Sequence, residues 1–243
     1  MVTKNQIKHI TALQQKKYRQ SEGLFIAEGQ KVINELLHSQ FKLQHLYFTD
    51  AIFPTITQDQ KTQISDDQLK KISALTTQNN CLAVFAMQQE QPINTTGLVV
   101  ALDNLRDPGN MGTIIRLCDW FGITQLLCSY GTVDLYNPKV VQATMGSLTR
   151  VQVNYVDLPK FLEHQDIPVF GTFMDGENIY TQQLPQNAII VLGNEANGIS
   201  AEIESVVTQK LAIPRFGDLQ ATESLNVASA TAIILSEFSR NKN

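Results

Sequence analysis

Apolar and polar positions divide the chain into two stretches with different patterns. Before about Met87, short apolar runs mixed with helical spacing predict a small α/β unit. Its expected strands are 24–28, 43–49 and 81–87, and its expected helices are 29–37 and 66–72. From Gly97 onward strands alternate with helices, which implies a mostly parallel sheet with helices on both faces. The expected strands there are 97–102, 125–129, 151–155, 168–173, 188–192 and 211–213, and the expected helices are 110–121, one opened by Asn137 and Pro138, and 223–240.

A polar segment, QQEQPINTTG at residues 88–97, separates the two stretches. It contains a proline and a glycine and has no apolar period, as is typical of a linker. We therefore expect an N-terminal domain at 1–90, a linker at 91–97 and a second domain at 98–243.

The last expected helix carries almost no charge. Thirteen uncharged residues, SLNVASATAIILS, lie between Glu223 and Glu237. A helix that is apolar on nearly every side must be buried on nearly every side, and this one is too short to span a membrane comfortably. It therefore belongs inside the domain, at a subunit interface, or at both.

The charge distribution points to a possible partner for the first residues. The net charge is −4, but five basic residues precede the first acid, Glu22: Lys4, Lys8, Lys16, Lys17 and Arg19. Such a basic leader can neutralise the phosphates of a nucleic acid. It can equally be the solvated face of an amphipathic helix, and the sequence alone leaves both interpretations open.

The composition argues against several classes of protein. With 43% hydrophobic and 17% charged residues the chain is globular, and no apolar run reaches the roughly 18 residues of a membrane helix. The N-terminus lacks the apolar core of a signal peptide. Histidines match no metal-ligand spacing, so no metal is expected. The cysteines have the pattern of reduced core thiols in a cytoplasmic protein: Cys81, Cys118 and Cys128.

Three polar clusters each follow an apolar strand, where open parallel sheets bind their ligands. They are ALDNLRDPGNMGTIIRLCDWFGI (101–123), IIVLGNEANGIS (189–200) and LAIPRFGDLQATESLNVASA (211–230). Neither a dinucleotide-binding GxGxxG nor a P-loop is present. In the first cluster we expect Asn110 to cap a helix. Arg116 lies off the apolar face of that helix and is available to substrate or to a second subunit, unless it is a surface arginine paired with Asp119.

The other two clusters also allow two interpretations. Glu195, at a strand end, is either a surface charge or a carboxylate directed into a site. Ser224 and Asn226 either contribute to a site or only satisfy free N–H groups where the last helix begins.

Taken together, the clusters resemble a known family. Asn-x-x-x-Pro-Gly-Asn-x-Gly…Arg, Leu-Gly-Asn-Glu-x-x-Gly-Ile-Ser and Ile-Pro…Glu-Ser-Leu-Asn-Val-Ala resemble the ordered motifs of SpoU (TrmH-like) RNA 2′-O-ribose methyltransferases of the SPOUT superfamily. Residues 137–153 are similar to that family's intervening segment, so the resemblance covers roughly 97–240. Upstream, FIAEGQKVINELL at 25–37 is similar to the start of an L30e-like substrate-binding domain.

The resemblance implies a fold, a cofactor and a site. The fold would be an α/β parallel sheet with a deep trefoil knot, the cofactor S-adenosylmethionine, the substrate RNA, and the assembly a homodimer with its active site beside the interface. The implied cofactor-binding residues are Thr172, Gly193, Asn194, Glu195, Ile213 and Leu225. The implied catalytic residues are Asn110, Arg116, Glu195, Ser224 and Asn226.

The implied reaction is displacement of the sulfonium methyl group by a ribose 2′-hydroxyl. Because a guanidinium stays charged, we expect Arg116 to bind the target phosphate and stabilise the forming alkoxide instead of acting as a base. The chain departs from the family in a longer loop at 217–223, which puts the adenosine contacts in question. Ribosomal RNA is the expected substrate; the alternatives are tRNA methylation and a non-catalytic RNA-binding protein with a degenerate methyltransferase fold.

Overall fold

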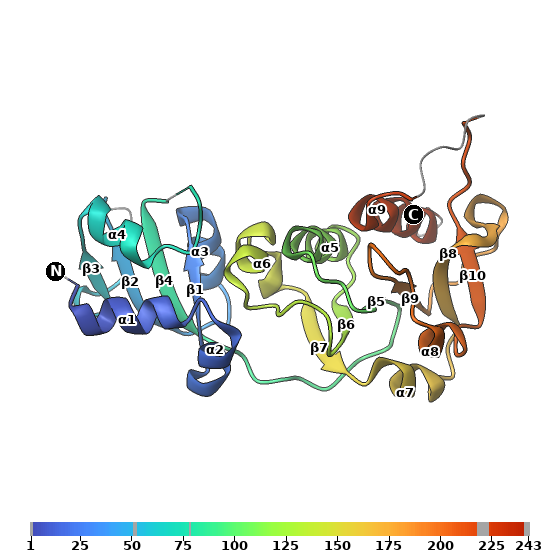
Figure 1. Cartoon of the computed structure of the whole chain (residues 1–243), viewed down its shortest axis with the longest axis horizontal. Helices are drawn as coiled ribbons and strands as arrows, with labels where there is room; N and C mark the ends of the chain where they lie inside the picture. The colour runs from blue at the N-terminus through green and yellow to red at the C-terminus, as the bar shows by residue number, and fades with distance from the viewer. Residues whose placement is uncertain (1, 51–52, 78, 218–223, 241–243) are drawn as a thin grey trace. The chain divides into compact units, whose positions relative to one another are not determined.

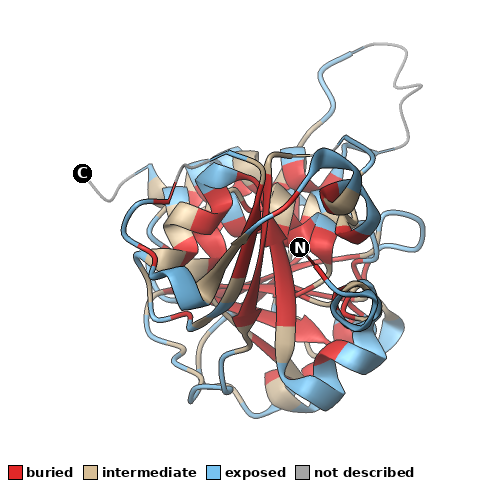
Figure 2. Cartoon of the chain, turned by 90° about the vertical axis from the view of Figure 1, so that its left-hand side faces the viewer, coloured by how far each residue is buried: buried red, intermediate tan, exposed pale blue. Residues whose placement is uncertain are grey.

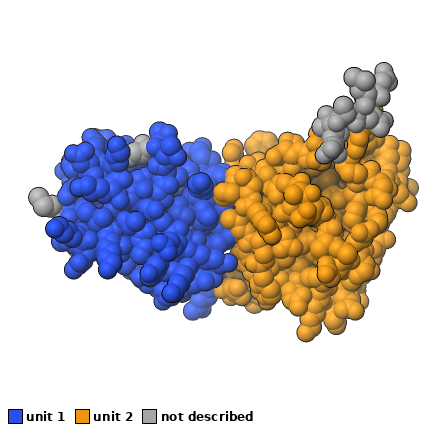
Figure 3. Space-filling model, in the orientation of Figure 1, with its two compact units in different colours: residues 1–89, 134–149 blue, residues 90–133, 150–243 orange. Residues whose placement is uncertain are grey.

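The computed structural model describes residues 2–50, 53–77, 79–217 and 224–240. The chain forms two compact units (Figure 3). Unit 1 contains residues 1–89 and 134–149, and unit 2 contains residues 90–133 and 150–243.

Unit 1 is built on a four-stranded mixed sheet (Figure 1). In spatial order its strands are β1 (Leu24–Glu28), β4 (Cys81–Ala86), β2 (Leu43–Phe48) and β3 (Lys61–Gln63). β4 pairs antiparallel with β1 and β2, and β3 pairs parallel with β2. The apolar runs predicted the first three strands, whereas β3 is too short to leave a recognisable period.

Two helices of unit 1 begin with a capping box, in which side chains satisfy free backbone N–H groups. Thr3 and Ser65 each form a capping box with the glutamine three residues later. The helices are α1 (Lys4–Ala12), α2 (Lys16–Glu22), α3 (Gln30–Leu37), α4 (Asp66–Ile72) and α6 (Pro138–Ala143), with the short 3₁₀ turns η1 (Gln58–Gln60) and η2 (Ser147–Thr149). Figure 2 shows that the strands consist mainly of buried residues, whereas the helices have exposed residues on their outer faces.

Segment 134–149 is part of the interior of unit 1, although it lies between two stretches of unit 2. The Tyr136 ring packs on Phe25 with 4.7 Å between centroids, and its hydroxyl accepts a hydrogen bond of 3.1 Å from the backbone N–H of Gln88. Asn137 caps α6, as predicted, by accepting from the Lys139 N–H at 3.0 Å. The segment therefore contributes an aromatic core residue as well as a helix.

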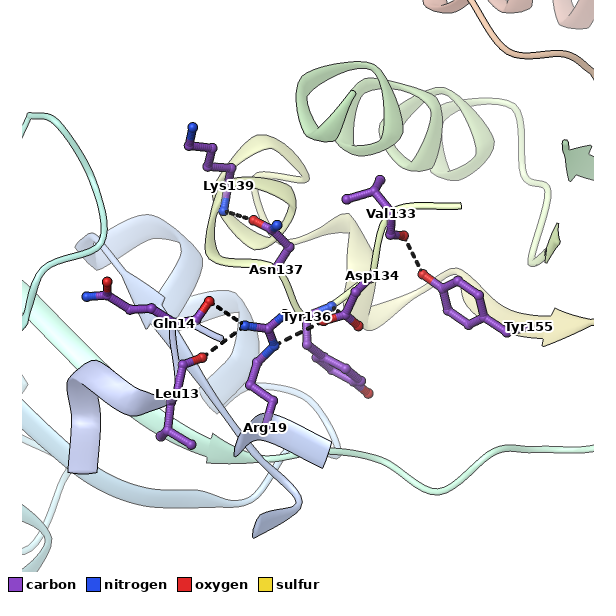
Figure 4. Close-up of polar contacts among 9 residues, drawn as sticks. All are labelled: Leu13, Gln14, Arg19, Val133, Asp134, Tyr136, Asn137, Lys139 and Tyr155. Carbon is purple, nitrogen blue, oxygen red and sulfur yellow. Dashed lines mark hydrogen bonds and ion pairs between the residues drawn. The ribbon is translucent and has the colours of Figure 1, made fainter. Parts of the chain in front are cut away.

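Arg19 fits neither interpretation left open for the basic leader, because it is neither available to phosphates nor solvated. Its side chain is only 2% exposed and forms an ion pair with Asp134, and its Nη1 donates to the carbonyls of Leu13 and Gln14 at 3.0 and 2.9 Å (Figure 4). A buried arginine persists only when paired, and Asp134 supplies that pair. The four lysines of the leader are exposed.

Unit 2 contains the predicted parallel sheet (Figure 1). Six strands pair in parallel in the order β10, β8, β9, β5, β6, β7. Their bounds are β5 (Leu98–Leu102), β6 (Gln125–Ser129), β7 (Gln152–Val156), β8 (Val169–Asn178), β9 (Ala188–Leu192) and β10 (Gln209–Ala212). The central strands β5 and β9 are buried at every position, which explains their uniformly apolar sequences.

β8 is longer than the predicted 168–173. Its second half is polar, and its pairing with β10 decides its length: Lys210 is opposite Gly171, but Leu211 is opposite Glu177. Residues 172–176 thus bulge between two paired stretches.

The helices of unit 2 are α5 (Pro108–Trp120), α7 (Leu158–Glu163), α8 (Ala201–Glu204) and α9 (Val227–Ser239), with a 3₁₀ turn η3 (Ile179–Thr181). α9 begins four residues later than predicted and packs against α5. It buries Ile234 and Phe238, with the Phe238 ring 5.3 Å from that of Phe170. None of the helices in the described ranges has the length and apolar character that crossing a membrane requires.

Candidate active site

Three of the predicted catalytic residues are joined by hydrogen bonds. The Nδ2 of Asn226 donates to the Oδ1 of Asn110 at 2.9 Å, and the Nδ2 of Asn110 donates to the Oε1 of Glu195 at 2.8 Å. These residues come from α9, α5 and the loop after β9. The structure therefore brings together, at the carboxyl edge of the sheet, one residue from each of the three polar clusters.

The hydrogen-bonding groups on either side fix the donor and acceptor orientation of the two asparagine amides. The Oδ1 of Asn226 accepts from the backbone N–H groups of Ala228 and Ser229 at 2.9 and 3.3 Å, so its Nδ2 must face Asn110. An ionised carboxylate only accepts, so Asn110 must turn its Nδ2 toward Glu195. Asn226 is thus a helix cap, as one of the two interpretations held, and it also donates a hydrogen bond to Asn110; its contribution to a site stays a prediction.

Asp107, and not Asn110, caps α5. The Oδ1 of Asp107 accepts from the backbone N–H of Asn110 at 2.7 Å, and Pro108 occupies the first helical position, where no N–H is needed. The expectation that Asn110 caps this helix is therefore wrong. Because Asp107 serves the helix end, the Asn110 side chain is left for Glu195.

Glu195 projects from a closed turn. Asn194 and Gly198 exchange two backbone hydrogen bonds of 2.9 Å each, and Gly198 has a φ of 68°. A Cβ on Gly193 would lie 2.2 Å from the carbonyl carbon of Gly198, so only glycine fits before the turn. The exposed Glu195 side chain is held by this turn in reach of Asn110.

Asp103 and Asn104, just after β5, fasten both ends of that loop. The carboxylate of Asp103, 2% exposed, accepts from the backbone N–H of Ser200 at 2.7 Å. The Nδ2 of Asn194 donates to the carbonyl of Asn104 at 2.7 Å. The Asn194 side chain therefore stabilises the loop itself. Its contribution to cofactor binding would be to maintain the shape of the turn.

Asn104 adopts a left-handed backbone conformation, with a φ of 53°, which asparagine tolerates better than most residues. Its backbone N–H donates to the Oγ of Ser129 at 2.8 Å. A Cβ on Gly131 would lie 1.9 Å from the Asn104 Oδ1, so a larger residue there would displace the Asn104 side chain. Sequence reasoning missed this network; the available signal was the pair of polar residues directly after a buried strand.

Two predicted catalytic residues stand apart from the cluster. Arg116 and Ser224 are exposed, and neither side chain makes a hydrogen bond or ion pair with any residue in the described part of the chain. The alternative pairing of Arg116 with Asp119 does not occur, because Asp119 binds Arg150, with 2.9 Å between Oδ2 and Nη2. Arg116 is therefore free to meet a substrate or a second subunit.

The remaining cofactor candidates lie around the ends of neighbouring strands. Thr172 on β8 and Ile213 after β10 are partly exposed, and Leu225 before α9 is 50% exposed. A half-exposed leucine beside a polar cluster is suited to the apolar face of a nucleoside, with the polar atoms of the turn beside it. Of the unusual loop at 217–223, residues 218–223 lie outside the described residues.

The cysteines and possible metal ligands offer no rival site. Burial raises the pKa of the Cys81 and Cys118 thiols to about 12, and it raises the pKa of Cys128 as well, so none is a thiolate at neutral pH. No cluster of three or more potential metal ligands occurs among the residues that the structure describes.

Comparisons with known proteins show which family the chain resembles along its length. The model of the SpoU rRNA methylase family matches residues 97–236, and that of the MRM3-like substrate-binding domain matches residues 4–83. A 23S rRNA (guanosine(2553)-2′-O)-methyltransferase from Bacillus subtilis is 30% identical over 96% of this chain and 95% of its own length.

Solved structures show the same similarity. One from Porphyromonas gingivalis, assigned to the TrmH family of RNA methyltransferases, superposes with a TM-score of 0.89 at 40% identity over 99% of both chains. An AdoMet-bound rRNA methyltransferase from Sinorhizobium meliloti gives 0.86 at 28% identity, over 99% of this chain and 96% of its own. Since the family pattern spans more than half of the chain and a nearly full-length relative shares 30% of its residues, the chain belongs to the SpoU rRNA methylase family.

Proposed function

We propose that this protein uses S-adenosylmethionine to methylate a ribose 2′-hydroxyl of ribosomal RNA. The observation that carries the proposal is the hydrogen-bonded chain from Asn226 through Asn110 to Glu195, in a domain of the SpoU family. The S. meliloti and B. subtilis relatives are rRNA methyltransferases, the first solved with AdoMet and the second a 2′-O-methyltransferase. S-adenosylmethionine supplies an electrophilic methyl group when bound, so the protein must mainly align the hydroxyl and manage its proton.

Glu195 and Asn110 are proposed to position the ribose. The second carboxylate oxygen of Glu195, Oε2, has no hydrogen-bond partner among the described residues, so it can accept from a ribose hydroxyl or from Arg116. Asn110 cannot rotate away from Glu195 without losing the hydrogen bond from Asn226. Arg116 is proposed to bind the target phosphate and stabilise the forming alkoxide, and Ser224 to shape the pocket.

The cofactor is proposed to lie against the turn at Gly193–Glu195, with Thr172, Ile213 and Leu225 beside it. The fit rests on the close approach that the missing Cβ of Gly193 permits and on the half-exposed Leu225. A titration calorimetry experiment with S-adenosylmethionine distinguishes this enzyme from a non-catalytic RNA-binding protein. Absence of binding would favour the latter.

Unit 1 is proposed to capture the RNA, as the substrate-binding domain predicted for 1–90. Its sequence holds 11 lysines and arginines against 8 acidic residues, whereas unit 2 holds 8 against 15. A polyanion is therefore attracted by unit 1 and repelled by unit 2. Exposed lysines lie on the five helices described for it: Lys4 and Lys8 on α1, Lys16 and Lys17 on α2, Lys31 on α3, Lys70 and Lys71 on α4, and Lys139 on α6.

A homodimer with α9 near its interface is also proposed. Trp120 on α5 is 84% exposed, and Ile233 on α9, which packs against α5, is only partly buried. An apolar surface of this kind is suited to a second copy. Light scattering across a dilution series should give twice the chain mass of 27.1 kDa, and a stable mass near 27.1 kDa would refute the dimer. Ile234 and Phe238 of α9 are buried inside the unit, so substitutions there would report on folding and not on the interface.

The deciding experiment uses RNA from a strain that lacks the protein. Purified ribosomal RNA and tRNA pools are incubated with labelled S-adenosylmethionine, and 2′-O-methyl groups are then mapped. Label in ribosomal RNA supports the proposal, and label in tRNA alone supports the alternative substrate. The Arg116→Ala variant should abolish transfer while cofactor affinity stays unchanged, and Arg240→Ala, with 59% of its side chain exposed, is the matched control. We place the reaction in the cytoplasm, where three buried cysteines without disulfide partners remain reduced.

A further inference from the structure

Exposed apolar side chains of the described residues gather near the carboxyl edge of the unit 2 sheet. Of seven large ones, four belong to β8, to the segments that follow β8 and β10, or to the approach to α9: Met174, Tyr180, Phe216 and Leu225. Phe216 is 82% exposed and Tyr180 is 36% exposed. Aromatic rings are costly to leave in water, so a pair of them beside a reaction site indicates a ligand.

Tyr180 and Phe216 form one pair, whose ring centroids are 6.3 Å apart with the planes 34° from parallel. The pairing follows from strand register, because Ala212 at the end of β10 is opposite Asn178 at the end of β8. Asn178 then caps η3 by accepting from the Tyr180 N–H at 3.0 Å, and Ile179 is buried beside it. The backbone of Tyr180 is thus fixed while its ring stays partly in solvent.

This pair lies at the same edge of the sheet as the proposed catalytic cluster. β8 is the parallel neighbour of β9, and the loop after β9 carries Glu195. β8 pairs with β9 up to Gly171, and its register with β10 places Asn178 only two β10 residues beyond that level, so the segments after β8 and β9 leave the same edge of the sheet. η3 also packs against α9, the helix that Asn226 caps.

The charge of unit 2 decides which part of an RNA these rings can bind. With 8 basic against 15 acidic residues, unit 2 repels phosphates, so contacts that hold RNA near the reaction cannot rest on charge alone. Unstacked bases bind to aromatic side chains without requiring a positive protein surface. A base that leaves its stack next to the methylated ribose would regain that stacking on protein rings.

We propose that Tyr180 and Phe216 form a stacking platform for an unstacked base of the RNA substrate. The proposal rests on the proposed function, which supplies the RNA. It assigns to the aromatic pair the binding of a nucleobase, separate from the phosphate contacts of unit 1 and from the hydrogen-bonded cluster.

The test compares variants that remove the ring with variants that keep it. Because stacking on an aromatic side chain contributes about 1–3 kcal/mol per base, Phe216→Ala and Tyr180→Ala should each raise the KM for ribosomal RNA by about 5- to 150-fold. Phe216→Leu, which keeps apolar bulk without a ring, should be as impaired as Phe216→Ala, and Phe216→Trp should restore the wild-type KM. Met174→Ala, 55% exposed on β8 but without a ring, is the control that should leave the KM unchanged.

Fluorescence gives a readout that does not depend on methylation. The wild-type chain has one tryptophan, Trp120, so a second one in Phe216→Trp is observed against that baseline. A short single-stranded oligoadenylate should quench it, whereas an oligomer of equal length without bases should not. Full activity of Phe216→Leu, weaker S-adenosylmethionine binding by Phe216→Ala, or a changed mass in light scattering would each overturn the platform, in favour of an apolar cover, a cofactor contact or a subunit contact.

A failure of the proposed function is recognised separately. If the wild-type protein methylates no RNA, the function is wrong, and quenching by oligoadenylate alone still decides whether the rings bind bases. If the wild-type protein methylates RNA and all ring variants match it, only the platform is wrong.

Discussion

Replacing Arg19 tests whether this residue of α2 binds RNA or stabilises the interior of unit 1. The Nε of Arg19 lies 3.0 Å from the Asp134 carboxylate, and the Nη1 group serves two backbone carbonyls of the turn before α2. With 2% of Arg19 exposed and 14% of the Asp134 side chain, solvent screens this pair poorly. Arg19→Ala leaves a carboxylate without its cation and two carbonyl oxygens without their donor.

We expect Arg19→Ala to lower the free energy of unfolding by about 3–5 kcal/mol, the usual cost of removing one partner of a buried ion pair. Arg19→Met combined with Asp134→Leu should cost less than Arg19→Met alone, because replacing both charges leaves neither one unpaired. Arg240→Ala breaks an ion pair whose arginine is 59% exposed and whose Glu237 side chain is 14% exposed, so it should cost less than Arg19→Ala, because solvent reaches the guanidinium.

Urea unfolding followed by circular dichroism measures these free energies, and RNA affinity is measured on the same samples under native conditions. Folded Arg19→Ala should bind RNA as the wild type does, whereas Lys17→Ala should weaken binding and reduce its salt dependence. A stability loss below about 1 kcal/mol for Arg19→Ala, together with weaker RNA binding, would refute the buried pair and return Arg19 to the RNA-facing surface.

Three further predictions concern single residues. Asp103→Ala should lower kcat about 10- to 100-fold in the methyl-transfer assay, because the loop that carries Glu195 loses its anchor at Ser200; an unchanged kcat would show that the loop holds itself. Gly193→Ala should abolish S-adenosylmethionine binding in calorimetry, because its Cβ would lie 2.2 Å from the Gly198 carbonyl carbon, and normal affinity would mean that the turn is not part of the cofactor site. Burial raises the pKa of Glu28 above its ordinary 4.5, so the folded state holds that proton more tightly and the contribution of Glu28 to stability falls as pH rises above 4.5. In urea unfolding, the stability of Glu28→Gln relative to wild type should therefore increase with pH, and a constant difference would contradict the raised pKa.

The regular elements that the sequence predicted well are those whose burial is uniform. The strand at 188–192 has the predicted bounds because every residue in it is apolar and buried, so its apolar run ends where the strand ends. α7 and α8 have six and four residues, which is too few to show a helical period. The knotted threading of the chain rests on family resemblance alone and stays a prediction.

Residues of the candidate site that belong to sequence motifs were predicted. Contacts that form only between distant parts of the folded chain were missed. Asn110, Glu195 and Asn226 were assigned through motif resemblance, and the structure joins them; their roles in the reaction stay predictions. The anchor between Asp103 and Ser200 spans 97 positions, and such a distance leaves no periodic trace. Arg19 was misassigned for the same reason, since its burial depends on a carboxylate 115 positions away.

The path of the chain also limits how this protein can be divided or rearranged. It passes between the units three times, near residues 89, 133 and 149, so the units are not joined by a single linker. Lengthening the segment at 88–97 would leave the two other connections in place, so it would not let unit 1 move independently of unit 2. An exchange of the N-terminal unit between relatives, by recombination or by design, must therefore include residues 134–149. A unit from another protein would lack the packing surface that matches this segment.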